Sequence, residues 1–292
     1  MKLSDLYDTN STIDFNDIVI CSDNELFIDP FKIKKSKEDL SKKCNKKLLD
    51  FFSTATMYVM EEKSLDELFD KLNECNETRL GWSKDSPKGK GVSGKLGEQL
   101  SFAMKNHPLI LNGVMEEIED ISIFIEGFGS DRISDICTRV ILMELAEYTK
   151  EWCEKLNIPC ALSLKEKHYW DSSTHTWGKA RFILPSANNL DIIFTPVYFT
   201  SNCLALRDFS DFVNLGVLEY YKEFYKDEGL SSLERSLKNN QKKEPYKKDI
   251  VKFFKEKGID IYDKAFFSDL DEKTQRKIVK IYKEYKNYKL QN

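Results

Sequence analysis

The stretch from residue 121 to residue 156 constrains the fold more than any other part of the chain. Residues 121–126 are rich in isoleucine, which predicts a β-strand. The turn at 127–130 contains two glycines. From Asp131 to about Leu156, apolar residues recur at three- and four-residue spacing, which predicts one long helix. A strand that enters a helix through such a turn is typical of α/β proteins, and ligands often bind there.

The rest of the chain predicts further strands in its first two thirds and helices throughout. Short apolar or β-branched runs predict strands at 18–21, 26–28, 160–164, 180–184 and 190–200. Helical periodicity begins near Ser36, Ser64 and Gly94, and the sequence after Asp208 predicts helices only. We therefore expect a mixed α/β (α+β) fold with a small central sheet, surrounding helices and more helix than strand. The expected domains are a mixed core at 1–205 and a helical region at 206–292.

Charge is distributed unevenly between these two regions. The chain has 292 residues, 41% of them hydrophobic, and a net charge of −4. This apolar content excludes a disordered or low-complexity protein. Residues 231–292 hold 17 basic and 10 acidic side chains, so an acidic body precedes a basic C-terminal region. Such a region suits an electrostatic partner, although a solvated helical surface explains the same lysines.

The cysteines and the N-terminus predict a cytoplasmic protein. Seven cysteines are scattered with no CxxC pair, which indicates free thiols in a reducing compartment. The first residues lack the apolar segment of a signal peptide, and no window has the roughly 18 apolar residues that span a bilayer. We expect no membrane association.

Two aspartates that follow the glycine turn are the leading candidates for a metal site. Asp131 and Asp135 are four residues apart, so both carboxylates lie on one helical face. With Glu98 or Glu126 nearby they would hold Mg²⁺, which takes one or two carboxylates together with substrate phosphates. Arg132 would then contact phosphate. The structural alternative is that Ser130 or Asp131 caps the helix while Asp135 pairs with Arg132 or Arg139.

A glycine-rich segment before residue 96 provides a candidate phosphate-binding loop. Residues 89–95 fit the letters of the GxxxxGK loop, but Leu96 stands where Ser or Thr would hold magnesium, and no buried strand precedes it. We instead expect either an ordinary connection or a basic loop whose lysines contact nucleic-acid phosphates: Lys84, Lys88, Lys90 and Lys95.

His168 is a candidate general base, because histidine titrates near neutral pH. It lies in a segment that mixes aromatic and charged residues, suited to a partner, to a stacked base or to an ordinary edge hairpin. A zinc site is also conceivable there, but the spacings of its four candidate ligands match no known finger: Cys153, Cys160, His168 and His175.

The (Asp/Glu)-x-Lys motif of many metal-dependent nucleases is missing. Residues 61–63 fit its letters but fall at a helix end, and the strand predicted at 190–200 carries Asp191 without a lysine. This argues against a standard restriction-type site.

Several segments together resemble an uncharacterised family of bacterial proteins found near mobile elements and phage-defence genes. The segments are 26–30, 77–83 with the glycine-rich loop, 127–135, 148–149 and 157–159. The resemblance covers residues 25–200 and implies defence or toxin-like chemistry on nucleic acid. Such proteins end the strand near Leu190 with Pro-Lys, whereas this chain has Pro196-Val197, which argues against a catalytic lysine there.

These observations lead to a defence-associated protein that acts on nucleic acid as a metal-dependent phosphodiesterase. Asp131 and Asp135 would bind Mg²⁺, with Glu98 as a third carboxylate and Arg132, Lys95 and Lys90 on phosphates. The alternative is a non-catalytic interaction or sensor subunit that binds a protein from the same operon, and nucleotide binding at the Gly127 turn is a third reading. Self-association into a homo-oligomer stays open.

Overall fold

The computed structural model describes most of the chain and divides it into two compact units. It describes residues 1–7, 12–81, 95–106, 110, 115, 117–118, 120–125, 128–202, 209–227 and 245–289. The first unit comprises residues 1–107 and 116–205, and the second comprises 108–115 and 206–292. Of the described residues, 56% are helical and 12% lie in strands, so the fold is mixed α/β with helix exceeding strand, as predicted.

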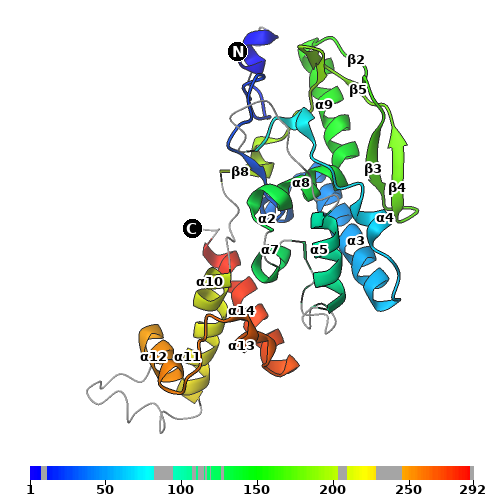
Figure 1. The fold of residues 1–292 in the computed structure, drawn as a ribbon. Helices are drawn as coiled ribbons and strands as arrows, with labels where there is room; N and C mark the ends of the chain where they lie inside the picture. The colour runs from blue at the N-terminus through cyan, green and yellow to red at the C-terminus, as the bar shows by residue number, and fades with distance from the viewer. Residues whose placement is uncertain are drawn as a thin grey trace. The chain divides into compact units, whose positions relative to one another are not determined.

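The first unit contains most of the helices and all the strands of the described chain (Figure 1). Its helices are α1 (Leu3–Leu6), α2 (Pro30–Lys35), α3 (Asp39–Met60), α4 (Asp66–Phe69), η1 (Asn76–Thr78), α5 (Lys95–Asn106), α7 (Asp120–Phe124), α8 (Ser130–Val140), α9 (Leu142–Leu156) and η2 (Val197–Phe199). Its strands are β1 (Phe27–Ile28), β2 (Ala161–Leu162), β3 (Lys167–Asp171), β4 (Thr176–Ala180), β5 (Ile183–Leu184), β6 (Ser186–Ala187), β7 (Leu190–Asp191) and β8 (Thr200–Ser201).

The strands do not form the single central sheet that the sequence predicts. Within the described residues they pair as four separate antiparallel ladders, β1–β8, β2–β5, β3–β4 and β6–β7. Only β3–β4 is long, with five residue pairs from Lys167↔Ala180 to Asp171↔Thr176. A ladder of two residue pairs gains few hydrogen bonds, so the stability of this unit comes from helix packing.

The hairpin β3–β4 packs against helices through an aromatic cluster. Trp170 is fully buried and its ring meets those of Phe51 on α3 and Trp177 on β4 edge-on. Its indole Nε1 donates a hydrogen bond of 2.7 Å to Oδ2 of Asp50, so burial leaves no polar atom of this ring unpaired. The hairpin therefore stands at a fixed position beside α3, α8 and α9 (Figure 1).

The strand predicted at 121–126 is wrong. Residues 120–124 form the helix α7, and Ile121, Ile123 and Ile125 are all buried. Oδ2 of Asp120 accepts a hydrogen bond from the backbone N–H of Glu117 at the start of this helix. A five-residue apolar run fits a buried helix as well as a strand, and packing against α8 decides between them.

The long helix predicted from Asp131 to Leu156 is present in two parts. The helix α8 ends at Val140, Ile141 takes a turn conformation, and α9 continues to Leu156. Asn157 then ends α9 in the left-handed conformation (φ +53°), which asparagine tolerates better than most residues. Both parts bury one face in the core of the first unit.

Every secondary-structure element described in the second unit is a helix. It contains α10 (Phe209–Phe212), the π-helical turn η3 (Val213–Val217), α11 (Leu218–Asp227), α12 (Lys247–Glu256), α13 (Lys264–Ser268) and α14 (Glu272–Lys289). The rings of Phe267 and Tyr282 pack edge-on against Phe212. Gly216 allows η3 to approach α14 closely, because an added Cβ would lie 3.0 Å from Tyr282. Asp271 caps α14 by accepting a hydrogen bond from the Thr274 N–H.

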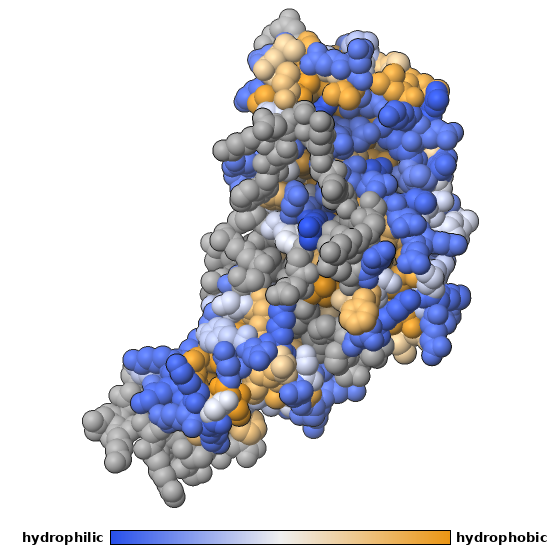
Figure 2. Space-filling model, in the orientation of Figure 1, coloured by the Kyte–Doolittle hydropathy of each residue, from blue (hydrophilic) through white to orange (hydrophobic). Residues whose placement is uncertain are grey.

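The surface of the described part of the chain is largely polar. Figure 2 shows hydrophilic side chains over most of the visible face, with smaller hydrophobic areas between them. None of the described helices combines the length and the apolar character needed to cross a bilayer. The described cysteines form no disulfide bond.

Candidate functional site

The first turns of α8 hold the two aspartates that the sequence singles out. Asp131 and Asp135 lie four residues apart on this helix, as predicted. The residue that precedes the helix is Gly129, and no side chain caps its N-terminus. Within the described part of the chain, neither carboxylate forms a hydrogen bond or an ion pair. The described structure therefore shows neither a helix cap at Asp131 nor an ion pair between Asp135 and Arg132 or Arg139, the roles that the alternative interpretation gave them.

Two further carboxylates approach the same helix end from distant parts of the chain. The Cβ that a substitution at Gly81 would add lies 3.5 Å from Oδ1 of Asp131 and 3.6 Å from Oδ2 of Asp23, so these oxygens are no more than about 7 Å apart. The charges of Asp23 and Glu74 also act on Asp135. Glu74 holds one carboxylate oxygen, Oε2, buried without a hydrogen-bond partner in the described structure. We call Asp23, Glu74, Asp131 and Asp135 the carboxylate cluster.

Burial and mutual repulsion shift the titration of the carboxylate cluster. Burial, followed by the charges of Asp131 and Glu74, raises the pKa of Asp135 to about 8, although Arg139 opposes the shift. Partial desolvation raises the pKa of Asp131 against the effect of Arg132, and desolvation followed by Asp23 raises the pKa of Glu74. The pKa values of Asp135 and Glu74 are raised by burial and by neighbouring carboxylates, whereas that of Asp131 is raised by burial alone.

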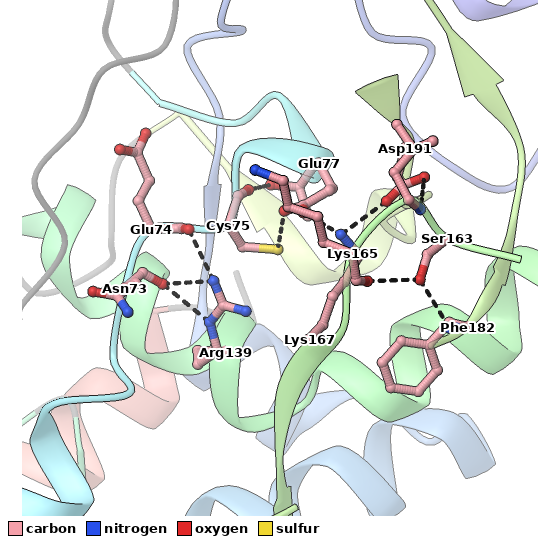
Figure 3. A network of polar contacts seen from close by, with 12 residues as sticks. Asn73, Glu74, Cys75, Glu77, Arg139, Ser163, Lys165, Lys167, Phe182 and Asp191 are labelled. Carbon is pink, nitrogen blue, oxygen red and sulfur yellow. Dashed lines mark hydrogen bonds and ion pairs between the residues drawn. The ribbon is translucent and has the colours of Figure 1, made fainter. Parts of the chain in front are cut away.

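Arg139 has its hydrogen bonds elsewhere. Its Nε and Nη2 donate to the backbone carbonyl of Asn73 at 3.0 and 2.9 Å, and Nη2 also donates to the carbonyl of Glu74 at 2.9 Å (Figure 3). This buried arginine fixes the segment that carries Glu74 against α8. Its donors are thus engaged by backbone oxygens, and the carboxylate of Asp135 receives only their longer-range field.

The remaining residues proposed from the sequence differ in what the structure describes of them. Glu98 lies exposed on α5 and is absent from the charges that act on Asp135. Arg132 follows Asp131 on α8, and its charge opposes the rise that burial causes in the pKa of Asp131. Lys95 is the first residue of α5, whose side chain is outside the described atoms, and Lys90 falls outside the described residues, as does Glu126.

His168 lies on β3, opposite Lys179 on β4. Burial, followed by the charges of Lys179 and Lys71, lowers the pKa of this half-buried imidazole. It is therefore neutral at neutral pH and able to accept a proton. Within the described structure, no hydrogen bond or ion pair joins it to the carboxylate cluster.

A second group of charges lies on the other side of the segment 73–81. Nζ of Lys167 on β3 forms ion pairs with Glu77 and, at 3.0 Å, with Oδ2 of Asp191 on β7 (Figure 3). The ammonium and Asp191 are buried, and Glu77 is partly so. Burial would raise the pKa of Glu77, but Lys167 outweighs it and the pKa falls.

This group contains a contact that the sequence does not reveal. A lysine beside Asp191 is present in space, although the strand that carries Asp191 has none, because Lys167 comes from another ladder. The sequence offered no spacing by which to find it, since Glu77, Lys167 and Asp191 belong to three separate segments. Asp23 and Glu74 were missed for the same reason.

The carboxylate cluster suits a hard divalent cation bound through few protein ligands. In the described part of the chain, no three side chains of His, Cys, Asp or Glu are close enough together to ligate one ion. Mg²⁺ commonly keeps several waters and takes only one or two carboxylates, completing its shell with substrate phosphates. Asp131 and Asp135 supply such oxygens, and the side-chain-free position of Gly81 leaves room beside Asp131.

Comparison with known proteins identifies a family for this chain but no activity. No curated protein and no solved structure matches it. The family model described as a domain of unknown function, DUF8370, matches residues 5–205. That span includes the carboxylate cluster and the ion pairs of Lys167, together with every strand of the described structure. The chain therefore belongs to the DUF8370 family.

Proposed function

We propose that this protein hydrolyses phosphodiester bonds of nucleic acid with the help of a divalent cation bound at Asp131 and Asp135. The observation that carries the proposal is the pair of carboxylates on one face of α8 that have no hydrogen bond or ion pair in the described structure, with Asp23 and Glu74 close by. Bringing like charges together costs free energy, and such a cost is common where a site binds a cation.

Each residue of the cluster has a role that its position allows. Asp131 and Asp135 would hold the cation directly, because they are the two carboxylates on one helical face. Asp23 and Glu74 would add negative field and orient water bound to the ion. Bound Mg²⁺ would supply Lewis-acid polarisation of a phosphate oxygen.

Positive groups beside the cluster would orient the substrate. Arg132, adjacent to Asp131 on α8, offers a guanidinium that suits a phosphate oxygen. Lys95 and Lys90 remain proposed phosphate contacts, and Glu98 a proposed further carboxylate. His168, neutral at neutral pH, remains the proposed general base, which the substrate would have to reach from β3.

The direct test compares isosteric variants. Purified full-length protein is incubated with single-stranded DNA, duplex DNA and RNA in Mg²⁺ or Mn²⁺. We expect Asp131→Asn and Asp135→Asn each to lower cleavage by about 10²-fold or more. Glu154→Gln, which alters an exposed surface pair on α9, serves as the control and should cleave like the wild type. Equal cleavage by all four proteins, or by none, contradicts the proposal.

A metal-binding measurement tests whether the cation binds, independently of whether the protein cleaves nucleic acid. We expect Mg²⁺ to raise the melting temperature of the wild type and of Glu154→Gln, but not of Asp135→Asn. Without metal, Asp135→Asn should melt above the wild type at pH 8, because it removes a buried charge from a repulsive cluster. Equal stabilisation of the wild type and Asp135→Asn by Mg²⁺ would contradict the assignment of the cation to this site.

The biological setting is part of the proposal. The resemblance to proteins found near phage-defence genes supports a defence role, and the scattered cysteines support a cytoplasmic location. A non-catalytic role as an interaction or sensor subunit is the second candidate, favoured by the lysines along α14, among them Lys277 and Lys280. The double variant Lys277→Glu/Lys280→Glu should then lose a co-purifying protein that the wild type retains.

A further inference from the structure

A pocket of about 320 Å³ lies beside the ion pairs of Lys167, within the first unit. None of the four residues of the carboxylate cluster lines it. Its walls include three cationic side chains, Arg79, Lys165 and Lys167, and two anionic ones, Glu77 and Asp191. Its volume is at the small end of the range for small-molecule sites and fits a ligand of about one nucleotide.

Arg79 is the residue that gives this pocket its chemistry. Only 3% of its surface is exposed, yet its Nε is buried without a hydrogen-bond partner and its guanidinium forms no ion pair in the described part of the chain. A buried guanidinium is stable only when an anion or several acceptors surround it. The backbone of Arg79 is also held in the left-handed conformation (φ +56°), which is unfavourable for arginine. The left-handed backbone ends η1, and the unpartnered buried Nε is the feature that points to an anionic ligand.

The neighbouring cations are not equivalent. Both carboxylates of the pocket pair with Lys167, so its charge is compensated inside the protein. Lys165 is exposed and forms no ion pair in the described structure. The hydroxyl of Ser163 donates a hydrogen bond to the backbone carbonyl of Lys165, so this contact holds the backbone and leaves the ammonium group unengaged. With three cations against two anions the pocket carries a net charge of +1, and Arg79 and Lys165 are the cations without an ion pair in the described structure.

The other walls suit the remainder of a nucleotide. Leu164 and Leu190 also line the pocket, and each exposes about half of its surface, 59% and 48% respectively. Exposed leucines provide apolar contact for a base or a sugar. Asn76 and Asn189 add amide groups, and Oδ1 of Asn76 is a second buried atom without a partner in the described structure.

We infer that this pocket binds a phosphorylated ligand the size of one nucleotide, with the phosphate on Arg79 and Lys165. A guanidinium presents parallel donors that match a phosphate, and an ammonium adds a mobile point charge. The ligand is either a free nucleoside monophosphate or the phosphorylated terminal nucleotide of a nucleic acid. The inference does not depend on the proposed hydrolysis, because the pocket and the carboxylate cluster have no residue in common.

The test measures binding by calorimetry with five probes: inorganic phosphate, adenosine 5′-monophosphate, adenosine, and a short oligonucleotide in two forms, with and without a 5′-phosphate. We expect the monophosphate to bind and adenosine not to bind. Tighter binding of the 5′-phosphorylated oligonucleotide than of the monophosphate identifies a strand end as the ligand, and the reverse identifies a free nucleotide. Failure of every phosphorylated probe to bind at millimolar concentration overturns the inference.

Variants locate the binding to this pocket. Arg79→Met should weaken binding of the monophosphate at least tenfold. Lys165→Glu, at an exposed position that leaves the fold intact, should do the same and keeps the test decisive if Arg79→Met is poorly folded. Lys179→Ala removes a positive charge from exposed surface outside the pocket and should bind like the wild type. Binding that survives Lys165→Glu unchanged overturns the assignment.

The same variants distinguish this inference from the proposed hydrolysis. Asp131→Asn should abolish Mg²⁺-dependent cleavage and leave binding of the monophosphate within twofold of the wild type. Loss of monophosphate binding in Asp131→Asn would place the phosphate at the carboxylate cluster and overturn the pocket. Absence of cleavage by any protein, with binding intact, would contradict only the hydrolysis.

Discussion

Nζ of Lys167 lies 3.0 Å from Oδ2 of Asp191, and the same ammonium pairs with Glu77, 90 residues earlier in the chain. These contacts join the hairpin β3–β4, the strand β7 and the segment around η1 in the first unit. The lysine has 6% of its side chain exposed, so the pairs are largely shielded from water and salt.

Removing this lysine should destabilise the first unit strongly. Lys167→Met leaves two carboxylates without their cation, one of them buried, and we expect a loss of about 3–5 kcal/mol in the free energy of unfolding. Urea unfolding measures it. Lys179→Met, on the adjacent strand but exposed, should change the same quantity by less than about 0.5 kcal/mol. A similar small loss in Lys167→Met would show that the pairs contribute little.

The same pairs should give the protein an acid-sensitive stability. Lys167 holds the pKa of Glu77 below its ordinary value despite burial, so the folded state binds the proton more weakly than the unfolded state. The stabilisation is then complete above the unfolded pKa of about 4.3 and is lost as the pH falls through the lower folded pKa. We expect Glu77→Gln to lower stability at pH 7 and to show a shallower decline than the wild type between pH 5 and 3. Parallel declines in urea unfolding would contradict this.

Gly81 should resist substitution because of its backbone conformation. Its φ of +140° is strained for any residue with a side chain, and an added methyl group would enter the space beside Asp131 and Asp23. We expect Gly81→Ala to cost about 1–3 kcal/mol in thermal unfolding. At Gly129, no atom lies within 4 Å of an added Cβ, so Gly129→Ala should cost less than Gly81→Ala. Equal losses in the two variants would contradict the strain assigned to the backbone of Gly81.

Gly178 and Tyr169 should behave as a coupled pair across the β3–β4 hairpin. They are directly opposite in register, and a Cβ added at Gly178 would lie 2.5 Å from Cζ of Tyr169. We expect Gly178→Ala to displace the tyrosine ring and to lower stability by about 1–3 kcal/mol. In Tyr169→Ala the clash is absent, so adding Gly178→Ala should cost much less. Additive losses in this double-mutant cycle would show that the two residues are independent.

The elements that were predicted correctly are those whose evidence is local. Helical spacing over 131–156 predicted α8 and α9, and the periodicity from Gly94 predicted α5, because a helix repeats its contacts every three to four residues. The run 121–126 was predicted wrongly as a strand. A strand needs a partner that the sequence does not identify, and a short apolar segment takes whichever form buries it.

The candidate site divides in the same way. The sequence by itself determined that Asp131 and Asp135 share a helical face, since their spacing matches the helical repeat. Only the tertiary structure decided that Asp23 and Glu74 join them and that Lys167 pairs with Asp191. The physical reason is that contacts between distant segments depend on how helices and ladders pack, and no spacing along the chain encodes that packing.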